Sequence, residues 1–113
     1  MITRSKGVLK MILTGKLEAE MKLVKRHIDV LTKVMRNQPI GIIKLAQMME
    51  LPEHKIRYSL RILEQENLIE PSPEGAKPTK RAKKEIKNIK NSLEKIIEDA
   101  NEMIAQIEEM EKM

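Results

Sequence analysis

The last third of the chain has an uninterrupted amphipathic pattern that limits how the whole protein can fold. From Thr79 to Met113 there is no proline or glycine. Over this stretch apolar side chains recur with alternating steps of three and four residues, which is the spacing of one face of an α-helix. We therefore expect a helix of up to about 35 residues, roughly 50 Å long. A small globular domain cannot cover such a helix, so its apolar face needs a partner surface.

The apolar face of this helix is wider than a simple coiled coil requires. Its members are Ile86, Ile89, Leu93, Ile96, Ala100, Met103, Ile107 and Met110 in the seam, with Ile97 and Ile104 beside it. A two-stranded coil prefers charged residues beside the seam, so the extra width suggests that more than two helices meet. We expect a homodimer in which the first and last helices of both chains form one bundle. The sequence leaves open whether the paired helices run parallel or antiparallel.

The first helix of that bundle is predicted over residues 16–36, where the apolar spacing is equally regular. The repeating residues are Leu17, Met21, Val24, Ile28, Leu31 and Met35. The helix should end before Gln38-Pro39, because proline restricts the residue before it to extended backbone. Its length of roughly 30 Å exceeds what a small helical domain needs, so the surplus should pack outside that domain. Residues 2–13 predict a short separate helix that ends near Thr14-Gly15.

A helix with two contrasting faces is predicted within residues 51–69. If it opens after Pro52, it places Ile56, Leu60 and Leu63 on one stripe at helical spacing. The opposite face carries His54, Tyr58, Arg61 and Gln65, with Lys55 and Arg57 on its flanks. One face should therefore pack against the protein. The other presents basic and polar groups that suit phosphates or the edges of bases.

The same stretch resembles the second helix and first wing strand of winged helix-turn-helix transcription regulators of the prokaryotic and archaeal type. The recognition helix of that family often reads V-S-x-x-L-x-x-L-E-x-x-G-L-I, and the matching residues here are Ile56-Arg57, Leu60, Leu63-Glu64 and Asn67-Leu68-Ile69. Asn67 replaces the usual glycine, and asparagine is the next most tolerant of left-handed backbone. The resemblance implies a mainly α fold with a small β-wing, followed here by a long C-terminal coiled-coil-like helix.

The residues before this helix look like the first half of a helix-turn-helix. Ile40 is expected to supply one or two residues of a short strand, and Gly41 to cap a helix over 42–49. Leu45 and Ala46 should face inward, and the small side chain of Ala46 permits two helices to cross closely.

A proline-rich turn separates the recognition helix from the last helix. Three prolines occur within residues 70–78, and proline cannot donate hydrogen bonds to a β-ladder. The wing should therefore be short. Glu70 and Glu74 disfavour phosphate at its tip, so we expect Lys77 and Lys80 to meet a DNA backbone instead.

Basic residues are concentrated around the start of the last helix, for which Thr79 is the predicted N-cap. Residues 77–95 carry eight basic and two acidic side chains, whereas residues 96–113 carry one basic and six acidic. A solvated helix face is the ordinary explanation of such a run. The shortage of nearby acids nevertheless favours contact with phosphate, because the lysines lack partners within the helix.

Catalysis and metal binding are not expected. The chain has no cysteine, which excludes disulfides and thiolate metal sites. Its two histidines, His27 and His54, belong to no cluster with metal-ligand spacing, and we interpret His27 as a residue on the flank of the first helix. No phosphate-cradling glycine loop and no nucleophile with a neighbouring base is present. We expect no enzyme activity, no cofactor, no metal and no evident small-molecule ligand.

Membrane insertion is not expected either. The apolar run from Val8 to Leu13 is interrupted by Lys10 and is too short for a signal peptide or a membrane span. We expect a soluble, cytoplasmic protein without a membrane partner.

These patterns predict a homodimeric transcription regulator that binds double-stranded DNA sequence-specifically, with the recognition helix in the major groove. The chain divides into an N-terminal segment over 1–15, a winged helix-turn-helix domain over 16–78 and a dimerisation helix over 79–113. The expected DNA contacts are His54, Lys55, Arg57, Tyr58, Arg61, Lys77, Lys80, Arg81, Lys83 and Lys84. The alternative is a protein–protein interaction or architectural chromatin module with a coiled-coil arm, because a fold alone does not decide function.

Overall fold

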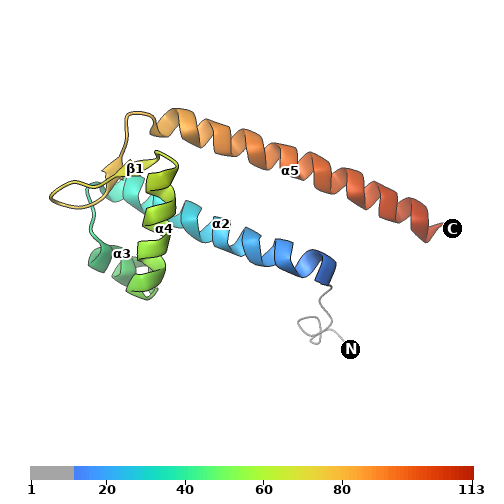
Figure 1. The fold of residues 1–113 in the computed structure, drawn as a ribbon, viewed down its shortest axis with the longest axis horizontal. Coiled ribbons are helices and arrows are strands. Elements are labelled where there is room, and N and C mark those ends of the chain that lie inside the picture. The colour runs from blue at the N-terminus through green and yellow to red at the C-terminus, as the bar shows by residue number, and fades with distance from the viewer. Residues whose placement is uncertain (1–11) are drawn as a thin grey trace.

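The computed structural model describes residues 12–113, which form a mainly helical architecture with one small sheet. Its elements are α2 (Ile12–Asn37), α3 (Ile42–Met49), α4 (Glu53–Gln65), β1 (Ile69–Glu70), β2 (Lys77–Pro78) and α5 (Ala82–Glu111). Figure 1 shows α3, α4 and the strands gathered at one end, while α2 and α5 both extend away from them. The prediction of a mainly α fold with a small β element is confirmed, and that element is a two-stranded sheet.

α2 begins earlier than its sequence pattern indicates. It runs without a break from Ile12 through Thr14 and Gly15 to Asn37, so the predicted end of a separate helix near Thr14-Gly15 is wrong. A single glycine costs a helix only about 1 kcal/mol, which does not by itself end it. The rest of the short helix expected over 2–13 lies outside the described residues.

One hydrophobic core forms where α2, α3, α4 and β1 meet. Val30 and Val34 of α2, Leu45 of α3, Ile56 of α4 and Ile69 of β1 are all at most 2% exposed. Burying an aliphatic side chain of this size stabilises a fold by about 1.5–3 kcal/mol relative to leaving it in water. The inward stripe predicted for the helix within residues 51–69 is confirmed, because its apolar members Ile56, Leu60 and Leu63 are buried in this core.

The ends of α3 and α4 are set by backbone geometry. Gly41 is the N-cap of α3 and Pro52 that of α4, as the sequence predicts. Asn67, just beyond α4, has a φ of 61°, which confirms the left-handed backbone expected of it. Glu50 closes α3 in the same conformation, with a φ of 54°. Glutamate has neither the freedom of glycine nor the tolerance of asparagine in this region.

β1 and β2 form an antiparallel pair of two residues each, with Ile69 opposite Pro78. The β segment after α4 is therefore short, as the prolines of residues 70–78 predict. Ile40 adds one bridge to this sheet: its N–H donates to the carbonyl of Ala76 at 3.0 Å, and its carbonyl accepts from the N–H of Ala76 at 2.8 Å. Ile40 thus supplies the short strand expected before α3.

α5 begins at Ala82, two residues later than an N-cap at Thr79 predicts. Its N-cap is Arg81, so the prediction of Thr79 in that role is wrong. The hydroxyl of Thr79 instead donates to the carbonyl of Asn67 at 2.6 Å and accepts from the N–H of Arg81 at 3.2 Å. The side chain of Thr79 therefore links Arg81, just before α5, to Asn67, just after α4.

Only the first turns of α5 join the core. Ala82 is buried, and Ile86 and Ile89, which the sequence assigns to a dimer seam, pack against the core of their own chain. Farther along, Ile104 and Met110 are each 53% exposed, and Figure 1 shows this part of α5 extending away from α3 and α4. No helix in the described part of the chain combines the length and apolar character needed to cross a membrane.

Candidate nucleic-acid interface

α4 presents the polar face predicted from its sequence. Its exposed residues include His54, Lys55, Arg57, Tyr58 and Arg61. Its buried residues are Ile56, Ser59, Leu60 and Leu63. The helix therefore turns one stripe into the core and leaves a polar stripe, rich in positive charge, open to solvent.

One of these basic groups has a partner on its own helix. Nη2 of Arg57 lies 3.7 Å from Oε1 of Glu53, and both side chains are more than half exposed. An exposed pair of this kind contributes only about 0.3–0.5 kcal/mol, so a phosphate group can compete for the arginine. Lys55 and Arg61 make no ion pair within residues 12–113, which leaves both available to an acidic ligand.

A buried hydroxyl joins α4 to α2. Ser59 is fully buried, and its Oγ accepts a hydrogen bond from Nε of Arg26 at 3.1 Å. The same oxygen lies 2.8 Å from Nδ1 of His27, which is 9% exposed. The interpretation of His27 as a simple flank residue is therefore wrong. The sequence does contain a signal for this contact. Ser59 is a polar residue on the apolar stripe of α4, and a polar group buried there requires a hydrogen-bonding partner.

The surroundings of His27 favour its neutral form. Burial lowers the pKa of His27 below its ordinary value of 6.5, and the positive charge of Arg26 lowers it further. A neutral imidazole has one nitrogen that accepts a hydrogen bond. The three groups are satisfied together when Arg26 donates to Oγ of Ser59 and the hydroxyl of Ser59 donates to Nδ1 of His27.

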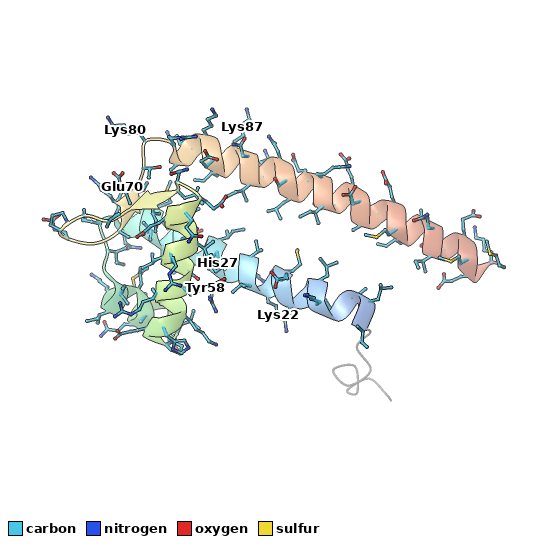
Figure 2. The ribbon with its side chains drawn as sticks, in the orientation of Figure 1. Lys22, His27, Tyr58, Glu70, Lys80 and Lys87 are labelled. Atoms are coloured by element: carbon cyan, nitrogen blue, oxygen red, sulfur yellow. The ribbon has the colours of Figure 1, made fainter. Side chains whose placement is uncertain are left out.

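Tyr58 lies beside the same crossing of α2 and α4. Its ring centroid is 5.6 Å from that of His27, with 51° between the ring planes. The guanidinium carbon of Arg26 lies 5.9 Å from the centroid of Tyr58, within cation–π range. Figure 2 shows Tyr58 and His27 together, with Lys22 farther along α2. Arg26, which is half-buried, therefore places a positive charge of α2 beside the exposed face of α4. We call His54, Lys55, Arg57, Tyr58, Arg61 and Arg26 the α4 surface.

The basic residues near the sheet form a second surface, which we call the α5 basic surface. Lys80, Lys83, Lys84 and Lys87 are its exposed members. Figure 2 shows Lys80 and Lys87 on the side of α5 that faces away from Tyr58. The structure thus separates the predicted DNA contacts into two groups. It does not bring these lysines onto the same patch as Tyr58.

Two further predicted contacts are paired with acids. Nζ of Lys77 lies 3.8 Å from Oε2 of Glu70 on the neighbouring strand. Nη2 of Arg81 lies 3.2 Å from Oε2 of Glu85, one turn into α5. Both cations are about half exposed or more, so these pairs are weak.

Comparison of the chain with protein-family models and with curated proteins found no match. Within residues 12–113, no group of three histidine or acidic side chains is placed to hold a metal ion. The features of the described residues that bear on function are the two basic surfaces and the exposed part of α5.

Proposed function

We propose that the protein is a homodimeric transcription regulator that binds double-stranded DNA sequence-specifically, with α4 as the recognition helix of a winged helix-turn-helix domain. The observation that carries the proposal is the division of α4 into a buried apolar stripe and an exposed stripe with Lys55, Arg57 and Arg61. An α-helix fits the major groove of B-DNA, where arginine can make two hydrogen bonds to guanine.

The order of the elements supports this role for α4. Within residues 12–113 three helices precede a two-stranded hairpin, and a residue before α3 bridges to that hairpin. In helix-turn-helix proteins the second helix of the motif, which here corresponds to α4, enters the groove while the first crosses the backbone. The turn between them contains the left-handed residue Glu50, which allows a sharp change of direction.

The two basic surfaces have different roles in the proposed complex. The α4 surface lies on the helix that reaches base edges, so Arg57, Tyr58 and Arg61 supply sequence preference. The α5 basic surface lies beyond the hairpin, where Lys80, Lys83 and Lys84 contact phosphates without reading bases.

The homodimer is inferred from the exposed part of α5. Ile97, Met103, Ile104, Ile107 and Met110 are each 52–59% exposed. A contiguous apolar stripe of this kind marks an interaction surface, because single chains in water seldom leave one uncovered. A second copy would bring two α4 helices to one DNA molecule, whose site would then be an inverted repeat.

Fluorescence anisotropy of duplex DNA, titrated at several salt concentrations, tests the proposal. Binding should weaken steeply with salt, because each neutralised phosphate releases counterions. Arg61→Ala should relax sequence preference, with a loss of about 1–3 kcal/mol on the preferred site. Lys83→Ala should weaken all sequences alike and reduce the salt slope by about 1. Lys112→Ala, at the acidic end of α5, is the matched control and should change neither. Negligible binding at low salt contradicts the proposal.

One observation favours the alternative, a protein–protein interaction module. Ile43 and Met48 of α3 are 63% and 39% exposed, so the helix that packs against α4 leaves two large apolar side chains in solvent. Ile62, on the flank of the recognition helix, is half-buried and adds little to it. A chain that dimerises but leaves the anisotropy of DNA unchanged at low salt would favour this alternative.

A further inference from the structure

α2 and α5 leave an apolar groove between them. Its walls are Met21, Val24 and Ile28 of α2 and Ile89, Leu93 and Ile97 of α5. Figure 1 shows these two helices extending from the same end of the molecule. No segment within residues 12–113 fills this groove, although its walls are the apolar stripes that an amphipathic helix normally buries.

Charges of both signs border the groove. Lys22 and Lys25 lie on its α2 side and Lys90 on its α5 side, while Glu66, Glu85 and Glu94 also line it. The three lysines make no ion pair within the described part of the chain, whereas Glu85 is paired with Arg81 at 3.2 Å. An occupant of the groove should therefore be a helix with an apolar stripe, and acids on that helix could pair with the unpaired lysines.

The second half of α5 is itself such a helix. Residues 97–111 contain six acidic side chains and no lysine or arginine, whereas residues 82–96 contain five lysines and two glutamates. Only one of the six acids, Asp99, is paired within residues 12–113, with Lys95 at 3.0 Å. Ile104 and Ile107, on the apolar side of this half, are 53% and 52% exposed. Its apolar stripe matches the walls of the groove, and its net negative charge complements the five lysines of the first half of α5.

We propose that α5 of a second copy packs antiparallel against α5, crossing it near Ile97, so that the acidic half of each copy lies along the groove of the other. The inference rests on the proposed homodimer and adds the direction of its helices. A parallel pair would place acids beside acids and lysines beside lysines. An antiparallel pair places the acidic half of each copy beside the more basic half of the other, and this complementarity of net charge favours the antiparallel orientation.

The heptad pattern agrees with a crossing near Ile97. Lys90, Ile97 and Ile104 lie seven residues apart and share one position beside the seam. In an antiparallel pair centred there, Ile97 meets its own copy, and Ile104 meets the aliphatic stem of Lys90. Asp99 also comes near its own copy, but its ion pair with Lys95 offsets the repulsion. Ile97 and Ile104, the apolar residues beside the seam, thus each contact the second copy.

This arrangement separates the two α4 surfaces. Ala82 precedes Ile97 by 15 residues, so the two helix starts lie about 45 Å apart at a rise of about 1.5 Å per residue. One turn of DNA spans only about 34 Å. The two half-sites should therefore be centred more than one helical turn apart.

Cysteine cross-linking tests the direction directly, because the chain has no cysteine of its own. Ile97→Cys and Ile104→Cys are matched variants, on the same helix face and 59% and 53% exposed. After oxidation, Ile97→Cys should give at least about tenfold more covalent dimer than Ile104→Cys. In the antiparallel pair the two thiols of Ile104→Cys would lie about 21 Å apart, beyond the roughly 7 Å limit of a disulfide. A parallel dimer in register would link both variants or neither.

A mixture of two variants makes the test independent of any single cysteine. Lys90→Cys and Ile104→Cys should each fail to cross-link alone but should cross-link when mixed. The oligomeric state of every variant and of the unchanged chain is measured by sedimentation before oxidation. A dimer in which Ile104→Cys links to itself, or in which the mixture stays unlinked, overturns the antiparallel arrangement. A chain that sediments as a monomer at every concentration refutes the homodimer itself, which is a separate result.

Discussion

Oγ of Ser59 lies 2.8 Å from Nδ1 of His27, and this contact connects α4 to α2 inside an otherwise apolar interface. The same hydroxyl accepts a hydrogen bond from Arg26, which also lies over Tyr58. Apolar packing alone lets two helices slide at little cost, whereas a buried hydrogen bond is satisfied in only one register. The orientation of α4, and with it the proposed α4 surface, is therefore tied to one buried serine.

Replacing that serine should destabilise the fold. Ser59→Ala leaves buried Nδ1 of His27 without a partner, which costs about 1–3 kcal/mol. The free energy of unfolding can be measured by urea denaturation at fixed protein concentration. Asn91→Ala, at an exposed position of α5 outside the groove, is the control and should change stability by no more than about 0.5 kcal/mol. Equal effects of the two variants would show that the buried contact contributes nothing.

The pKa of His27 predicts a loss of stability in mild acid. Burial and the neighbouring Arg26 lower the pKa of His27 below 6.5 in the folded state. Between that lowered pKa and 6.5 the unfolded chain binds more protons than the folded chain, so protonation favours unfolding. The stabilisation is complete above pH 6.5 and declines as the pH falls below it, before most carboxylates protonate.

Thermal unfolding between pH 7.5 and pH 5 checks this pH dependence, and the chain supplies its own control. His27→Gln keeps a hydrogen-bonding side chain but cannot titrate, so its stability should depend less on pH over this range. His54→Gln removes the exposed histidine of α4 and should keep the slope of the unchanged chain. A slope that disappears with His54 rather than His27 would show that His27 is not the group responsible.

Gly75 is required by the close approach of the hairpin turn to Ile40. Its φ is 133°, and a Cβ there would overlap the carbonyl carbon of Ile40 and lie 2.6 Å from the carbonyl oxygen. Gly75→Ala should therefore lower the free energy of unfolding by about 1–3 kcal/mol through backbone strain. It should also weaken the bridge between Ile40 and Ala76. Denaturation measures the cost. Gly41→Ala is the control, because a Cβ at Gly41 meets nothing within 4 Å, and it should cost less than about 1 kcal/mol.

Local features of the fold could be predicted from the sequence because their causes are local. The boundaries of α3 and the start of α4 follow from Gly41 and Pro52 and from apolar spacing over a few turns. The backbone at Asn67 follows from the tolerance of asparagine for positive φ. Each of these predictions needed only a short window of neighbouring residues.

Contacts between distant segments could not be predicted in the same way. Ser59 and His27 are 32 residues apart, and their meeting depends on the angle at which α4 crosses α2. Likewise, periodicity shows that Ile86 and Ile104 share an apolar stripe, but not which surface covers each. The structure packs Ile86 against its own chain and leaves Ile104 exposed. For the same reason the separation of Lys80 from Tyr58 had no signal in the sequence.

The backbone at Glu50 offers a way to stabilise the protein. Glu50 has a φ of 54°, and left-handed backbone costs an ordinary residue roughly 1–2 kcal/mol. Within residues 12–113 its exposed side chain makes no ion pair, so Glu50→Gly removes strain without removing a contact. Part of the gain is offset by the greater freedom of glycine in the unfolded chain, about 0.5–1 kcal/mol, so a net stabilisation of up to about 1 kcal/mol is expected. Gln47→Gly, at an exposed position inside α3, is the matched control and should destabilise by about 1 kcal/mol. If Glu50→Gly raises the free energy of unfolding and Gln47→Gly lowers it in the same denaturation series, the backbone at Glu50 is strained. If both variants lower it by similar amounts, Glu50 carries no backbone strain.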